Sequence, residues 1–166
     1  KDSILAALHE SLRDRHMAEV DARLDPAHWA GRTLQELTLN YSQHLLDYYA
    51  ANHFLLVAIL KMDDAQVQQR VAATLQHVAQ RLSQALVVIL GREVPLLQVD
   101  LAIRSVFALV QQKTLFTPVG LRRAHADDWL DPARECALVM QLCLGAQGEA
   151  VEPMRAPGRG QARDQA

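Results

Sequence analysis

The chain has 166 residues, of which half are hydrophobic and only 5% are aromatic, and its formal net charge is −2. This length is enough for one domain with a core, and the scarcity of β-branched and aromatic runs favours an all-α fold. The charge argues against nucleic-acid binding by this portion alone, because neutralising phosphates requires a basic surface. The apolar runs fall short of the ~18 residues of a membrane span, and the periodic first residues do not resemble a signal peptide.

The chain opens inside an amphipathic helix, which the apolar spacing predicts over about residues 2–23. Its expected inner face consists of Leu5, Leu8, Leu12 and Val20. Asp25 and Pro26 end this helix. Because neither a methionine nor a cap comes first, we expect a fragment whose active end lies upstream.

A capping box predicts the second helix. The Thr33 hydroxyl can accept the Glu36 amide, and the Glu36 carboxylate can reach back to the Thr33 amide. The apolar stripe that follows, to about residue 51, comprises Leu34, Leu37, Tyr41, Leu45 and Tyr48. The next segment, 54–60, is too hydrophobic for a surface helix and too short for a membrane, so it predicts a short buried helix.

Caps also delimit the long fourth helix. Asp63 and Asp64 supply carboxylates at its N-terminus, and an apolar stripe of about seven turns leads to Gly91, a typical C-terminal cap. Pro95 is tolerated in the first turn of the next helix, which we expect to reach about Phe116.

Asp131 and Pro132 begin the last helix, over about 132–145, after a polar loop. Residues 146–166 lack a hydrophobic period, so we expect a disordered tail. The sequence thus predicts one all-α domain over residues 1–145, a six-helix orthogonal or antiparallel bundle.

The helices at about 95–116 and 132–145 carry apolar residues on more than one face, whereas a surface helix needs only one stripe. Either they are central in the monomer or they face a partner. Because a terminal helix is rarely surrounded by its own chain, we favour a homodimer in which these helices form an intermolecular four-helix bundle. The expected dimer contacts are Val106, Leu109, Val110, Leu138, Val139 and Leu142.

Motifs for catalysis or metal binding are missing from the sequence. His9 and His16 share a helix face, but neither has a second ligand at tight spacing, and no nucleophile elbow or phosphate loop is present. We therefore expect no enzyme activity, metal or cofactor. Cys136 and Cys143 lie two helical turns apart, too far to bond to each other. Reduced thiols suit a cytoplasmic protein.

Polar and aromatic residues interrupt several otherwise apolar stripes. Groups of this kind can line an apolar pocket with a few polar anchors; alternatively, they are ordinary residues at helix seams, with one end in water. The candidate ligand contacts are Tyr41, His44, Tyr48, His77, Phe107 and Gln111.

The order of these helices, together with the opening Lys1, Asp2, Leu5 and Leu8, resembles the C-terminal regulatory domain of TetR-type transcriptional repressors. The resemblance covers residues 1 to about 145 and leaves out the N-terminal helix-turn-helix of that family. It implies a homodimer that binds a small apolar effector. It also implies that operator DNA is bound only through the absent domain. It also implies that the effector shifts the spacing of the two DNA-reading heads through the first helix.

Two other functions stay open. A helical protein–protein interaction module predicts an exposed groove and a tightly packed interior. The second is a small-molecule carrier or an enzyme without a recognisable motif. An enzyme predicts a titratable pair with strongly shifted pKa values in a cleft. The regulatory domain predicts a closed cavity between the second, fourth and fifth helices.

Overall fold

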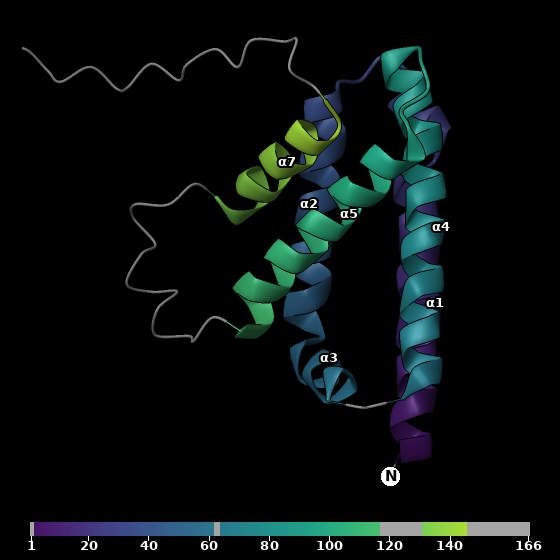
Figure 1. The fold of residues 1–166 in the computed structure, drawn as a ribbon, viewed down its shortest axis with the longest axis vertical. Helices are drawn as coiled ribbons and strands as arrows, with labels where there is room; N and C mark the ends of the chain where they lie inside the picture. Colours follow the sequence, from purple (N-terminus) through teal and green to yellow (C-terminus); the bar gives the residue numbers. More distant parts are fainter. Residues whose placement is uncertain (1, 62–63, 117–130, 146–166) are drawn as a thin grey trace, which may run out of the picture.

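The computed structural model describes residues 2–61, 64–116 and 131–145, and every regular element within these ranges is helical (Figure 1). The elements are α1 (Asp2–Arg23), the 3-10 turn η1 (Pro26–Trp29), α2 (Leu34–Ala51), α3 (His53–Leu60), α4 (Ala65–Leu90), α5 (Leu96–Gln111), the π-helical turn η2 (Gln112–Phe116) and α7 (Pro132–Cys143). The all-α prediction is confirmed. The predicted loop before residue 131 and the predicted disordered tail lie outside the described residues.

The helix ends follow the local capping signals. The Glu36 amide donates to the Thr33 hydroxyl at 3.2 Å, and the Thr33 amide donates to the Glu36 carboxylate at 2.8 Å, so the capping box of α2 is complete. Asp64 and Asp131 each accept a backbone amide in the first turn of α4 and α7. Gly91 ends α4 in the left-handed region, at φ +63. Each cap satisfies backbone groups that a helix end leaves unpaired.

The fifth helix reaches Phe116 as predicted, but its last five residues form a π-helical turn. Two other local predictions need correction. Segment 54–60 is helical but only partly buried, since Phe54 is 89% exposed while Ile59 is buried. In α1, Leu8 is exposed and the buried stripe consists of His9, Leu12, His16 and Val20. The 3-4-4 spacing of this stripe is helical, but two of its four positions are histidines.

The helices form two contacting sets (Figure 1). In the first, α1 and α4 run side by side. The Asp21 carboxylate joins them, because it accepts from His77 Nε2 at 2.8 Å and forms an ion pair with Arg81, whose Nε lies 3.0 Å away. In the second, α7 packs on α2 and α5. It runs antiparallel to α5, because Lys113 pairs with Glu135 at 2.6 Å and Cys143 Sγ lies 3.8 Å from Ser105 Oγ.

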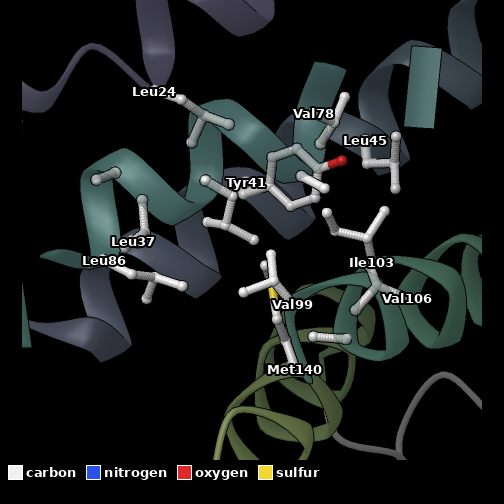
Figure 2. Close-up of a cluster of buried hydrophobic side chains, with 14 of the residues drawn as sticks. Leu24, Leu37, Tyr41, Leu45, Val78, Leu86, Val99, Ile103, Val106 and Met140 are labelled. Atoms are coloured by element: carbon white, nitrogen blue, oxygen red, sulfur yellow. The ribbon is translucent and has the colours of Figure 1, made fainter. Parts of the chain in front are cut away.

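The core joins both sets around Tyr41, which is 1% exposed. Figure 2 shows its ring surrounded by aliphatic side chains of several helices, with the hydroxyl directed toward Leu45 and Val78. Fully buried neighbours in this cluster include Leu37, Leu82, Leu86, Val99, Ile103, Val106 and Met140. Each large apolar side chain buried in this way stabilises the fold by about 1.5–3 kcal/mol, which keeps the helices around the adjoining pocket in place.

Candidate ligand-binding site

A pocket of about 300 Å³ lies where α1, α2, α3, α4 and α5 meet. Its walls are mainly apolar and consist of Leu56, Ile59, Val71, Leu75, Phe107 and Ala108. Four further residues bring polar groups to it, namely His9, Tyr49, Arg104 and Gln111. Apolar walls with a few polar anchors, at a volume of a few hundred Å³, are typical of a small-molecule site.

Two of the polar residues already satisfy each other. Gln111 Nε2 donates to the Tyr49 hydroxyl at 3.1 Å. Burial raises the pKa of Tyr49, so this hydroxyl stays protonated at neutral pH. The Phe107 ring meets the Tyr49 ring edge-on, with 6.0 Å between centroids. This corner of the pocket is therefore held rigidly by contacts between α2 and α5.

His9 offers a hydrogen-bonding atom that is not used. The residue is only 7% exposed, and its Nδ1 is buried without a hydrogen-bond partner among the described residues. Burial, followed by the nearby charges of Arg70 and Arg13, lowers the pKa of His9, so the imidazole is neutral at pH 7. A buried polar atom without a partner is unfavourable.

The structure brings two of the six predicted ligand contacts, Phe107 and Gln111, into this pocket. The other four lie elsewhere. Tyr41 is enclosed in the core, and His77 pairs with Asp21 on the outer seam of α1 and α4. His44 and Tyr48 pack against α1, in a separate cluster with His16.

This aromatic cluster forms the seam between α1 and α2. The His16 ring stacks on Tyr48 at 4.1 Å between centroids and lies parallel to His44 at 5.3 Å. Both nitrogens of His16 and Nε2 of His44 are buried without a partner among the described residues, while His44 Nδ1 is 3.7 Å from the Glu19 carboxylate. Burial lowers the pKa of His16 to about 4 and also lowers that of His44, so the stacked rings are neutral at pH 7.

The sequence did not single out His9, Tyr49 or the α3 residues as pocket residues. Two signals were available. His9 continues the spacing of Leu12 and His16 on one helix face, and Tyr49 lies two turns after Tyr41 on the inner stripe of α2. For α3, no signal in the sequence shows which face turns toward the pocket.

The predicted dimer contacts divide into three groups by their exposure. Val106 and Val110 have no exposed surface in the single chain, so in this conformation they are part of the core and cannot contact a partner. Leu109 and Val139 are half-buried. Leu138 and Leu142 are 40% and 57% exposed on the outer face of α7. Only the last group presents substantial apolar surface.

No protein-family model, curated protein or solved structure matches this chain. Within the described residues, no helix combines the length and apolar character needed to cross a membrane. In the same ranges, no group of three or more His, Cys, Asp or Glu side chains is placed to hold a metal ion. The pocket and the exposed apolar surface of this protein are therefore the features from which a function can be argued.

Proposed function

We propose that this chain is the effector-binding and homodimerisation part of a TetR-like transcriptional regulator whose DNA-reading heads lie outside it. The observation that carries the proposal is the pocket, because α1 contributes to its wall through His9. In the family that the helix order resembles, the helix corresponding to α1 connects to the DNA-binding domain. A ligand in this pocket would therefore touch the connecting helix directly.

The contacts of α1 support a tilting response. Near its C-terminal end, Asp21 joins α1 to α4 through His77 and Arg81. More than three turns closer to the N-terminus, His9 lines the pocket. A ligand that fills the pocket would therefore displace the N-terminal half of α1, while the ion pairs of Asp21 hold the C-terminal end of α1 in place. A ligand shifts such an equilibrium only if it binds the two orientations with different affinity. Two DNA-binding domains that read half-sites about 34 Å apart are sensitive to a small tilt of the helix that carries them.

Exposed leucines on α5 and α7 support the homodimer. Leu97 and Leu101 are 79% and 53% exposed on α5, and they lie one turn apart, as do Leu138 and Leu142 on the antiparallel α7. Monomeric proteins rarely expose extended apolar patches. A two-fold contact would place the same two helices of a second copy over these leucines, which gives four helices at the interface.

Sedimentation equilibrium of Leu138→Asp tests the dimer. We expect wild type to be dimeric at micromolar concentration and Leu138→Asp to be monomeric, because the interface would bury an unpaired charge. Val87→Asp is the matched control, since Val87 is 41% exposed, close to the 40% of Leu138, but lies on α4. It should stay dimeric. A dimeric Leu138→Asp would contradict the proposed interface.

Binding of a neutral bicyclic probe tests the pocket. We expect 2-naphthamide to bind the wild-type chain, as measured by fluorescence titration, and Ala108→Phe to abolish binding because the added ring fills the pocket. Ala73→Phe is the control, since Ala73 is exposed about 200° around α4 from Val71. A wild-type monomer that binds no probe would instead favour the helical protein–protein interaction module.

A further inference from the structure

We propose that the ligand of this pocket is a neutral molecule about two fused rings in size that carries an N–H or O–H group, and that the side-chain oxygen of Gln111 accepts from this group. The inference rests on the proposed function, because it names the chemical class of the effector. It follows from the volume of the pocket, from the charges in its lining, and from a hydrogen-bonding atom that the protein leaves unused.

The volume limits the size of the ligand. The pocket holds about 300 Å³, about twice the ~150 Å³ of an apolar cavity that accepts benzene. Its walls from α3 and α4 consist of aliphatic side chains, and α5 adds the Phe107 ring. A fused two-ring body therefore fits the apolar part, whereas a large polar molecule would leave many of its groups unpaired.

The charges in the lining favour a neutral ligand. Among the described residues that line the pocket, Arg104 is the one arginine or lysine, and its guanidinium already pairs with the Asp100 carboxylate at 2.7 Å. None of these lining residues is acidic. A cationic ligand would therefore meet no opposite charge, and an anionic one would compete with Asp100 for Arg104. Burying an unpaired charge is far less favourable than burying a neutral group.

Gln111 presents an unused hydrogen-bonding atom to the pocket. Its Nε2 donates to the Tyr49 hydroxyl at 3.1 Å, which fixes the position of the amide group. Its Oε1 accepts no hydrogen bond from any described residue. Unlike Nδ1 of His9, this oxygen is not enclosed by protein atoms, and the half-buried Gln111 side chain lines the pocket. An amide oxygen has two lone pairs that can accept from a donor.

An N–H or O–H group of the ligand would complete this corner of the pocket. The Phe107 ring packs edge-on against Tyr49, and Tyr49 holds Gln111, so the oxygen is in position before a ligand arrives. A donor that enters an apolar pocket loses its bonds to water, and the Gln111 oxygen would replace one of them. The polar end of the ligand would then lie between α2 and α5, and its rings would fill the part lined by α3 and α4.

The test compares two probes that differ in one group. 2-Naphthamide and 2-acetylnaphthalene share their rings and carbonyl, but the amide has N–H donors where the ketone has a methyl group. Equilibrium dialysis of the full 166-residue chain at pH 7.5 should give a dissociation constant about fivefold lower for the amide. Hydrophobicity alone predicts the opposite order, because an amide without a partner in the pocket loses its bonds to water.

Two substitutions of Gln111 identify the acceptor. Gln111→Met keeps the length of the side chain but removes the oxygen, so this variant should bind the ketone at least as tightly as the amide. Gln111→Glu keeps an acceptor oxygen at the same position and should retain the preference for the amide. Gln80→Met is the matched control and should behave as wild type, because Gln80 is exposed on α4 outside the lining. Circular dichroism of each variant verifies that it is folded.

The other outcomes have separate meanings. If wild type binds the ketone as tightly as the amide, or more tightly, the donor is not recognised and this inference is overturned, while the proposed function stands. If Gln111→Met retains the preference for the amide, or if folded Gln111→Glu loses it, the Gln111 oxygen is not the acceptor and the inference is also overturned. If neither probe binds wild type, both the inference and the ligand-binding part of the proposed function fail.

Discussion

Acidification should destabilise the fold through His16, which packs between Tyr48 and His44 and is 3% exposed. Burial lowers the pKa of this imidazole from 6.5 to about 4. Below pH 6.5 the unfolded chain therefore binds a proton that the folded chain does not, so stability falls as the pH drops from 6.5 toward 4. At pH 5 the linkage relation gives a loss of about 2 kcal/mol relative to pH 7.5.

His16→Leu isolates this contribution. The substitution replaces two unpartnered nitrogens by methyl groups, so at pH 7.5 the variant should be about as stable as wild type. Urea unfolding followed by circular dichroism, at one fixed protein concentration, gives the free energy of unfolding at pH 7.5 and pH 5.0. Wild type should lose about 2 kcal/mol more than His16→Leu between the two.

The exposed His28 provides the control. His28→Gln should show the same pH dependence as wild type, because the substitution leaves the buried aromatic cluster unchanged. Part of the wild-type loss will persist in His16→Leu, since burial also lowers the pKa values of His9 and His44. If wild type and His16→Leu lose equal stability on acidification, then His16 is not buried as a neutral ring and the packing of α1 on α2 described above is incorrect.

Three local predictions concern stability and reactivity. Thr33→Ala removes the capping hydroxyl of α2 and should lower the free energy of unfolding by about 1 kcal/mol in urea titrations. Gly91→Ala should lower it by about 1–2 kcal/mol, because no atom lies within 4 Å of the added Cβ and the left-handed backbone alone opposes it. Burial raises the pKa of the Cys136 thiol to about 11, so at pH 8 a thiol reagent should label the half-buried Cys143 well before Cys136.

The helix boundaries could be predicted because their causes are local. Thr33 and Glu36 are three residues apart, and Gly91 directly follows the last apolar turn of α4, so the sequence contains both partners of each cap. The packing of α1 differs in this respect. Nothing within one turn of His16 indicates that its ring will stack on Tyr48, which is thirty-two positions away in the chain. The apolar spacing predicts Leu8 on the inner face of this helix, whereas the structure buries His9 there and leaves Leu8 exposed.

The pocket could be predicted only in outline for a related reason. The inner stripe of α2 contains Tyr41, Tyr48 and Tyr49 within nine positions, and periodicity does not reveal which of them lies beside α5. Which tyrosine lines the pocket depends on where α3, which follows α2, brings Leu56 to the same pocket. Tyr41 is a predicted ligand contact, but the structure encloses it in the core.

The apolar character of α5 has two structural causes, which the sequence does not separate. Its inner stripe includes Val106 and Val110, which are fully buried against the core, and α7 covers a neighbouring face of the helix. Neither accounts for Leu97 and Leu101, which stay 79% and 53% exposed after both contacts are made. A monomer core would explain only the inner stripe. In the proposed dimer, the same pair of helices in a second copy would cover these outer leucines.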